Sequence, residues 1–345
     1  MKEMFTSLHV CRCACKPTQG LKNNVPTCQR ANVPTIFMAI GLLIVIMAIP
    51  ASVQAQTMVT LFDIGAGVRP LGMGGAFAAL ADDENALFYN PAGLGFLEEM
   101  RFGSFYEPRF GASFGDLALV GKNFGLGLVF FNLGGIEGRD AHDNVTETFT
   151  YGSSGTIAAG GMRLGDLPLP FGLPNNLALG LAAKLYQVSA LEGGNGSGIA
   201  LDLGFLWAQD LRVGQLPLGL RLGAVIENLG LAVAYKSGYS EGWPLGIRLG
   251  SALTVRDLTL ALDLETRGII HLGAEYRFTE VGQRFGLGTL TLRVGGFTQG
   301  GLVPTLGFGI QFKNFQLDYA FISYPQAPDT HRLSFAAEFK LPRLF

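Results

Sequence analysis

Apolar and polar residues alternate with period two in segment after segment from Met100 onward, and clusters of Gly, Asn, Asp and Pro separate these segments. In Leu258–Glu265, LTLALDLE, every even-numbered residue is leucine. A strand with this pattern has one uniformly apolar face, and its other face carries Thr259, Ala261, Asp263 and Glu265. Lipid does not tolerate the second face, whereas a polar lumen does. The pattern therefore predicts a strand whose leucine face meets lipid.

The same division recurs along the chain, with charged residues on one side of each segment. Arg248 lies opposite Ile247 and Leu249, and Glu275 lies opposite Ala274 and Tyr276. We expect the lumen of a barrel to receive Arg221, Arg248, Asp263, Glu275 and Arg293, with His271, Arg277, Lys184 and Asp202 in the same arrangement. A soluble β-sandwich also alternates. Segments of about 9–12 residues match tilted membrane-spanning strands and favour the membrane.

The pattern predicts an all-β fold, a transmembrane antiparallel β-barrel of about 14 strands. An even number places both ends of a single-chain barrel on the periplasmic side, and 12 or 16 strands are also compatible with the pattern. The expected strands lie at about 101–107, 111–121, 124–134, 147–163, 176–190, 198–209, 217–228, 244–255, 257–265, 269–279, 288–298, 303–312, 315–323 and 330–340. Tight turns are expected at 121–124, 256–257 and 313–315, and longer extracellular loops at 134–144, 190–197, 230–243 and 323–329.

The last expected strand, His331–Lys340, presents Leu333, Phe335, Ala337 and Phe339 on one face. It resembles the closing strand of outer-membrane proteins, whose aromatic-ended pattern the barrel-assembly machinery reads. Because Pro342 limits the strand, the aromatic signal is either Phe339 or the terminal Phe345. The expected partners are therefore outer-membrane lipid and the assembly machinery.

The N-terminal region has the features of a secretion signal. Positive residues precede an apolar run at Ile36–Pro50, and small residues at Val53 and Ala55 suit cleavage after Ala55. A run of about 15 apolar residues is short for a spanning helix, so a signal is favoured over an N-terminal anchor. The long extension before it is also compatible with a start codon placed too far upstream. We expect a signal peptide over 1–55, a plug over 56–99 and a barrel over 100–345.

Composition narrows the function classes. Residues 1–55 carry five Lys and Arg against one Glu, so the net charge of −2 becomes −6 for the mature chain, which gives no reason to expect nucleic acid. All four cysteines lie before the expected cleavage site, and neither a metal site nor a lipoprotein is indicated. Glycine accounts for 49 residues and only 15% of the chain is charged, which favours a β-rich membrane fold.

Between the signal and the first strand lies Gly65–Phe96, GAGVRPLGMGGAFAALADDENALFYNPAGLGF. Its combined pattern resembles the N-terminal signature of PorV/PorQ-type outer-membrane proteins, which belong to the FadL-like superfamily of barrels. The positions that carry the resemblance are Arg69, Pro70, Gly72, Gly74, Gly75, Asp82, Asp83, Asn90 and Pro91. The resemblance implies a segment that plugs the barrel, and the expected strand number agrees with that superfamily.

The residues of this segment allow two interpretations. Close packing of its glycines against a barrel wall and a turn at Asn90–Pro91 fit a plug. Asp82 and Asp83 would then pair with lumen arginines such as Arg221, Arg248 or Arg293. The alternative is a glycine-rich first strand and turn with both aspartates solvated.

Catalytic and cofactor motifs find no support in the sequence. Gly72-x-Gly74 lacks the third glycine and the βαβ unit of a dinucleotide site, and Asp83-x-Asn85 lacks the later ligands of an EF-hand. No Gly-x-Ser-x-Gly elbow occurs, and no histidine has metal-ligand spacing. We therefore expect no enzyme activity, no metal and no cofactor.

Two functions are compatible with these observations. The superfamily resemblance implies a barrel that binds or passes hydrophobic small molecules, with ligands held by apolar residues near the plug and moving laterally through a gap in the wall. The expected contacts are Phe77, Leu80, Phe88, Tyr89 and Leu94. The PorV-type resemblance implies instead a non-enzymatic carrier or interaction component of type IX protein secretion, which contacts secreted cargo through its extracellular loops.

Overall fold

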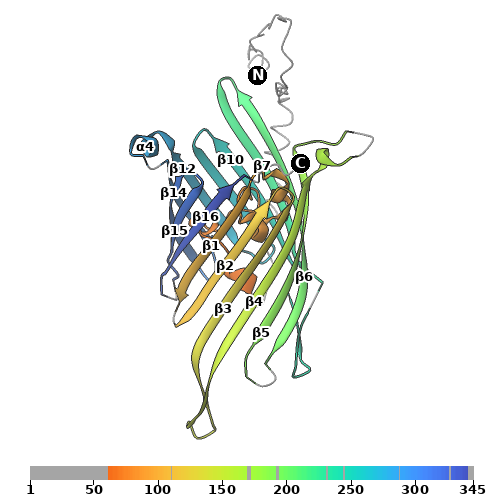
Figure 1. Ribbon diagram of the computed structural model, residues 1–345, viewed down its shortest axis with the longest axis vertical. Coiled ribbons are helices and arrows are strands. Elements are labelled where there is room, and N and C mark those ends of the chain that lie inside the picture. Colours follow the sequence, from red (N-terminus) through yellow and green to blue (C-terminus); the bar gives the residue numbers. More distant parts are fainter. Residues whose placement is uncertain are drawn as a thin grey trace, which may run out of the picture.

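The computed structural model describes residues 61–109, 111–168, 172–191, 194–230, 232–243, 245–286, 288–325 and 328–340. Figure 1 shows a barrel of tilted strands with the first described segment inside it. The predicted signal peptide at 1–55, Pro342 and Phe345 lie outside the described residues. Within the described residues, no helix has the length and apolar character needed to cross a membrane.

Fourteen strands of the described chain form one closed antiparallel barrel, as predicted. Each strand pairs with the next along the barrel, and closure comes from β1 pairing with β16, from Met100↔Phe339 to Tyr106↔Leu333. The strands are β1 (Met100–Arg109), β2 (Ala112–Gly121), β3 (Phe124–Arg139), β4 (Val145–Arg163), β5 (Leu177–Ser189), β6 (Gly196–Val213), β7 (Leu216–Leu229), β10 (Gly246–Val255), β11 (Leu258–Glu265), β12 (Ile270–Phe278), β13 (Thr289–Thr298), β14 (Leu302–Phe312), β15 (Phe315–Ile322) and β16 (Thr330–Phe339).

Two of the predicted loops contain strand structure. The 230–243 loop carries a small hairpin, β8 (Ala232–Tyr235) and β9 (Ser240–Gly242), and β8 pairs with β6 at Ser197↔Ala234. The 134–144 loop is largely a continuation of the β3–β4 hairpin, in which threonines favour extended backbone. Long connections with helical turns, η3 (Leu164–Asp166) and α4 (Thr279–Arg284), lie at the opposite end of the barrel from these loops.

The two ends of the barrel differ. We call the end with the tight turns at 122–123, 256–257 and 313–314 the turn end, and the end with the β3–β4 hairpin and β8–β9 the loop end. Positive φ angles at Asn123, Arg256 and Lys313 fit two-residue hairpin turns. The long β3–β4 hairpin projects from the loop end, and the longest extensions of outer-membrane barrels lie on the extracellular side, so the loop end faces outward from the cell.

Burial confirms the predicted alternation. The leucines of β11 point outward, with Leu260 46% exposed, whereas Asp263 on the same strand is completely buried. Exposed aliphatic and aromatic residues cover the outside of strands all around the barrel, and a closed barrel leaves no strand edge unpaired in hydrocarbon. These are the requirements of a protein that crosses the bacterial outer membrane on strands.

The first described segment, Leu61–Leu97, lies inside this barrel, and we call it the plug (Figure 1, orange). It consists of short helical turns, η1 (Leu61–Ile64), α2 (Arg69–Gly72), α3 (Ala86–Tyr89) and η2 (Pro91–Phe96). Pro70 and Pro91 stand at the starts of α2 and η2, where a missing N–H costs nothing. The alternative of a glycine-rich first strand is therefore wrong.

Candidate functional site

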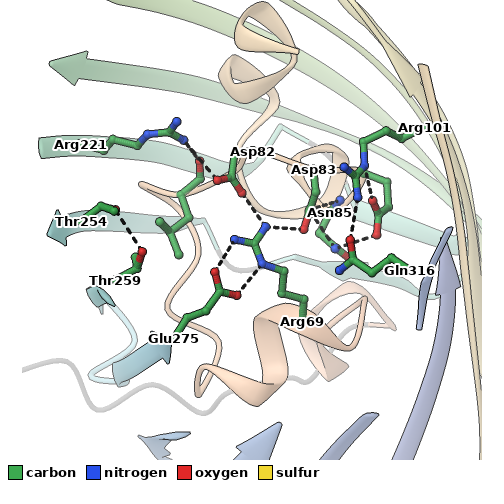
Figure 2. Close-up of polar contacts among 12 residues, drawn as sticks. Arg69, Asp82, Asp83, Asn85, Arg101, Arg221, Thr254, Thr259, Glu275 and Gln316 are labelled. Atoms are coloured by element: carbon green, nitrogen blue, oxygen red, sulfur yellow. Dashed lines mark hydrogen bonds and ion pairs between the residues drawn. The ribbon is translucent and has the colours of Figure 1, made fainter. Parts of the chain in front are cut away.

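Arg69, the first residue of α2 in the plug, binds three carboxylates (Figure 2). Its Nε and Nη2 donate to the two oxygens of Glu275 on β12 at 2.9 and 3.1 Å. Its Nη1 donates to Asp82 at 2.6 Å and to Asp83 at 2.7 Å. Because Arg69 and Asp83 are buried, these contacts replace the water that both charges would otherwise require.

The predicted partners of the two aspartates need correction. Of the three expected arginines, only Arg221 approaches, at 3.8 Å from Asp82. Arg248 pairs instead with Glu265 and Glu227, and Arg293 pairs with Glu275 and Asp318. The main partner of both aspartates is Arg69, which lies on the plug itself. The alternative of solvated aspartates is also wrong, since Asp83 is 1% exposed.

The charged network continues toward the turn end. Arg293 donates to Glu275 at 2.8 Å and to Asp318 at 2.6 Å, while Arg101 on β1 donates to Glu84 on the plug at 3.0 Å. All of these groups except Glu84 border a polar hollow of about 240 Å³. Its lining is almost entirely charged or hydrogen-bonding, which suits water and ions better than an apolar molecule.

Two carboxyl groups of the plug have pKa values that shift in opposite directions. Burial acts to raise the pKa of Asp82, but the Arg69 and Arg221 guanidiniums outweigh it and lower that pKa. Burial raises the pKa of Glu84 to about 7; the Asp83 carboxylate adds to this effect and Arg101 opposes it. Glu84 is therefore the plug group that titrates near neutral pH.

Several lumen residues hold the plug by its backbone. Asp263 accepts hydrogen bonds from the N–H groups of Phe77 and Ala78, both at 2.9 Å. Arg248 donates to the Gly75 carbonyl at 3.2 Å and Arg221 to the Leu80 carbonyl at 2.7 Å. These wall charges thus satisfy backbone groups that the irregular plug leaves without partners of its own.

Asn90 joins three parts of the structure. Its side-chain amide donates to the Ala78 carbonyl at 2.7 Å and to the Phe205 carbonyl of β6 at 3.0 Å. Its Oδ1 accepts from the Ala92 N–H at 3.1 Å and so caps η2. The predicted turn at Asn90–Pro91 is confirmed, and Asn90 also anchors the plug to the wall.

Glycines in the wall allow the plug backbone to approach. A Cβ on Gly273 would lie 2.4 Å from the Met73 carbonyl oxygen, and one on Gly295 would lie 2.3 Å from the Gly74 nitrogen. In the described chain, eight wall glycines, which we call the glycine belt, would each bring a Cβ within 3.0 Å of plug backbone: Gly161, Gly180, Gly204, Gly223, Gly250, Gly273, Gly295 and Gly307. The belt accounts for eight of the 25 glycines in the fourteen barrel strands.

Plug glycines make matching approaches. Gly72 lies against Gly307 of β14, and a Cβ on Gly74 would fall 2.4 Å from the nitrogen of Gly296. Gly74 and Gly75 also have φ angles of +64° and +80°, which glycine adopts without strain. The predicted close packing of plug glycines against the wall is confirmed at these positions.

The five predicted ligand contacts belong to the packing of the plug. Phe77 and Leu94 are completely buried, and the Phe77 and Tyr89 rings meet edge to face at 5.6 Å. Leu80 lies in the same cluster as Phe77, and Phe88 is only partly buried and packs against three clusters. The structure brings these residues together around the plug core, and their role in ligand binding stays a prediction.

A second apolar region, absent from the sequence prediction, lies in the loop-end half of the lumen. We call Phe62, Tyr186 and Trp243 the aromatic triad: Trp243 packs against Phe62 at 5.7 Å and against Tyr186 at 5.3 Å. Phe131, Tyr151 and Tyr235 are packed into the same cluster. Trp243 comes from the β9–β10 connection and Tyr186 from β5. The one sequence feature that could have indicated this apolar region was a tryptophan, Trp243, in the longest expected loop.

One buried ion pair supports the triad. Lys184 on β5 binds Asp202 on β6 at 2.5 Å, and its ammonium lies 4.9 Å from the centre of the Phe62 ring. Asp202 also accepts the N–H of Asn228, which has a φ of +60° at a bulge between β6 and β7. The predicted inward orientation of Lys184 and Asp202 is confirmed. Among the residues with described positions, no cluster of His, Cys, Asp and Glu is arranged to hold a metal ion.

Comparison with known proteins gave structural likeness only. No family model and no curated protein matches the chain. The fold is similar to the Ralstonia pickettii toluene transporter TbuX, with a TM-score of 0.45, 16% identity, and coverage of 81% of this chain and 99% of that one. It is also similar to a deltaS2S3 mutant of the monoaromatic hydrocarbon channel TodX, with a TM-score of 0.49, 13% identity and coverage of 79% and 97%.

More distant likeness extends to the outer-membrane protein OpdK of Pseudomonas aeruginosa, with a TM-score of 0.31, 13% identity and coverage of 70% and 98%. All three TM-scores lie below 0.5. The assignment of the fold therefore rests on the strand pairing and on the outward apolar faces of this chain.

Proposed function

We propose that the protein is a PorV/PorQ-type barrel of the FadL-like superfamily that binds or passes hydrophobic small molecules through its plugged lumen. The observation that carries this proposal is the aromatic triad with its surrounding apolar residues in the loop-end half of the lumen. An apolar lumen surface at the end that faces outward from the cell suits an apolar ligand, because transfer of the ligand's apolar surface from water to this region is favourable.

The described state is closed around this region. The three rings of the aromatic triad contact one another, and the Phe62 ring lies so near Gly155 that a Cβ there would fall 2.3 Å from it. An entering molecule must therefore displace Trp243, whose segment is a connection between strands. Displacement of this side chain costs less than movement of the plug, which the wall holds by many backbone hydrogen bonds.

Tryptophan fluorescence tests the proposal directly. The chain has only two tryptophans, so Trp207→Phe leaves Trp243 as the sole tryptophan reporter. Titration of this variant in detergent with toluene or with a long-chain fatty acid should give a saturable change in emission. Tyr186→Ala should weaken apparent affinity by about tenfold or more, given that about 1.4 kcal/mol corresponds to tenfold. An unsaturable or absent change for both probes contradicts the proposal.

Two further variants locate the site. Tyr276→Ala removes an outward-facing ring and should leave binding unchanged. Phe88→Ala with Tyr89→Ala removes two of the ligand contacts predicted from the sequence, so loss of binding there with no effect of Tyr186→Ala would move the site from the aromatic triad to the plug core.

A second candidate function, a carrier or interaction component of type IX secretion, is favoured by the β3–β4 hairpin. Pairing of β3 with β2 ends at Leu133↔Ala112, and pairing of β4 with β5 ends at Gly152↔Ser189. Beyond these pairs, the described parts of the two strands pair only with each other and leave both outer edges free. Free strand edges accept an added strand from another protein.

This candidate has its own test. Replacement of residues 134–150 by a two-residue Asn-Gly turn should preserve the heat-modifiable gel migration of a folded barrel. If the hairpin binds secreted cargo, the shortened protein should lose cross-links to cargo that the intact chain forms. Unchanged cross-linking would show that the hairpin does not bind cargo. Genes of a type IX secretion system next to the gene for this protein would support the role without an experiment.

A further inference from the structure

A row of outward-facing residues crosses five neighbouring strands near the loop end. Strand register places these residues side by side, in the order Phe130, Ser154, Gln187, Ser197 and Ala234. Gln187 and Ser197 are exposed, whereas the adjacent Tyr186 on β5 is buried in the lumen. The row therefore belongs to the outside of the barrel.

This row and the residues beside it line a hollow of about 500 Å³ on the outer surface. Asn132, Gly152 and Ser189 form the next outward row toward the loop end, and Lys236 lies just after β8. Gly152 has no side chain and those of Ser154 and Ser197 are small, which leaves room between the larger Asn132 and Gln187. We call this concave surface the rim hollow.

The rim hollow begins where the apolar band ends. One row nearer the turn end, register aligns Leu128, Thr156, Leu185 and Ile199, and the following row is Leu126, Ala158, Ala183 and Leu201. Leu185 is 49% and Ile199 46% exposed, as expected for residues that contact acyl chains. Across β5 and β6, the outward surface thus changes from Leu185 and Ile199 to Gln187 and Ser197 within one row of residues.

The chemistry of the rim hollow is mainly neutral. Within the described chain, the side chains of Gln187, Ser189 and Ser197 make no hydrogen bond to protein, so their donors and acceptors are available to a ligand. Lys236 is the one cation among the lining residues. Hydroxyl and amide groups match the hydroxyls of a sugar, and a single ammonium matches one anionic substituent. A phosphate-dominated head would instead favour a cluster of basic residues.

We propose that the rim hollow binds the sugar head group of an outer-leaflet glycolipid, whose acyl chains lie along Leu185 and Ile199. Hydrogen bonds from Gln187 and Ser197 orient the sugar, and Lys236 binds its anionic substituent. The site faces lipid and is separated from the lumen by the strands themselves. Its existence therefore does not depend on the hydrophobic-molecule function proposed for the lumen.

Native mass spectrometry of the full chain in detergent tests this site. The probes are lipid A, an acylated and phosphorylated glucosamine disaccharide, and phosphatidylglycerol at the same concentration. We expect lipid A to bind at least tenfold more tightly than phosphatidylglycerol. The combined variant Gln187→Ala, Ser197→Ala and Lys236→Ala should lower the affinity for lipid A about tenfold.

The matched control is His331→Ala, which removes an exposed polar residue from the outside of β16, away from β3–β6, and should leave lipid A binding unchanged. Heat-modifiable migration establishes that each variant is folded; if the triple variant is not, Gln187→Leu alone should produce a measurable loss. Equal binding of the two lipids, or unchanged lipid A binding in a folded rim-hollow variant, overturns the proposal.

Discussion

Arg69 and Glu275 form a two-point ion pair across 206 residues of sequence, with Nε–Oε2 and Nη2–Oε1 distances of 2.9 and 3.1 Å. The pair joins the start of the plug to β12. Arg69 also binds Asp82 and Asp83 within the plug, and Glu275 also binds Arg293 on the neighbouring strand β13. The pair therefore connects the polar contacts inside the plug with those inside the wall. Fork-to-carboxylate geometry fixes orientation as well as distance.

Removal of Arg69 should therefore be costly. Arg69→Ala leaves the buried carboxylates of Asp83 and Glu275 without their main partner, and we expect a loss of about 3–5 kcal/mol in the free energy of unfolding. Urea titration in detergent, followed by tryptophan emission, measures it. Arg139→Ala removes a surface ion pair on the β3–β4 hairpin and should cost about 1 kcal/mol or less. Equal effects of the two substitutions would contradict the assigned role of Arg69.

The glycine belt predicts a steric effect. Gly273→Ala places a methyl group 2.4 Å from the Met73 carbonyl oxygen, so the plug must shift, and we expect a loss of about 1–3 kcal/mol. Limited proteolysis should also cut the plug sooner than in the native chain. Gly242→Ala is the matched control, because a Cβ there meets nothing within 4 Å. Native-like stability of Gly273→Ala would show that the plug does not press on β12.

Asn90 allows a size-matched test of hydrogen bonding. Asn90→Ala loses three hydrogen bonds at a completely buried position, and we expect a loss of about 2 kcal/mol or more. Asn90→Asp keeps the shape but places a carboxylate oxygen against the Ala78 and Phe205 carbonyls, which should cost more than the alanine. Chemical unfolding compares the free energies of unfolding of the two variants. Asn144→Ala, in an exposed loop, serves as control, and a smaller loss of stability in Asn90→Asp than in Asn90→Ala would contradict this geometry.

Glu84 predicts the pH dependence of stability. Burial raises the pKa of Glu84 from 4.5 to about 7, so between these values the folded chain binds more protons than the unfolded chain. Stability from this group is thus present below about pH 4.5 and is lost as pH rises toward 7. Glu84→Gln should flatten the unfolding free energy over that window, while Glu98→Gln, at an exposed position, should not. An unchanged slope in Glu84→Gln would contradict the assignment.

Sequence alone predicted the barrel because the membrane imposes a local rule. Every second residue of a spanning strand meets lipid, so the alternating leucines at 258, 260 and 262 predict both the strand and the face that points outward. The inward charges of Asp263, Glu275 and Arg293 followed from the same parity. Strand number and closure were therefore accessible, whereas the β8–β9 hairpin, which is too short to show a period, was not.

The plug contacts were harder to predict because an irregular segment has no period. The pairing of Arg69 with Asp82, only 13 residues away, depends on how the plug folds back, and no spacing rule encodes that path. The glycine belt left a readable signal: Gly273 and Gly295 occupy inward positions where other strands carry side chains. The aromatic triad depends on a loop that folds into the lumen, which alternation within strands does not encode.

The plug precedes every strand in the chain, yet its backbone is bound by the last one: Arg332 of β16 donates to the carbonyl of Gly65. Glycines that admit the plug are distributed over strands from β4 to β14. A segment in contact with so much of the circumference cannot enter readily once β16 has met β1. The pairing of β1 with β16 that closes the barrel therefore also completes the wall that encloses the plug.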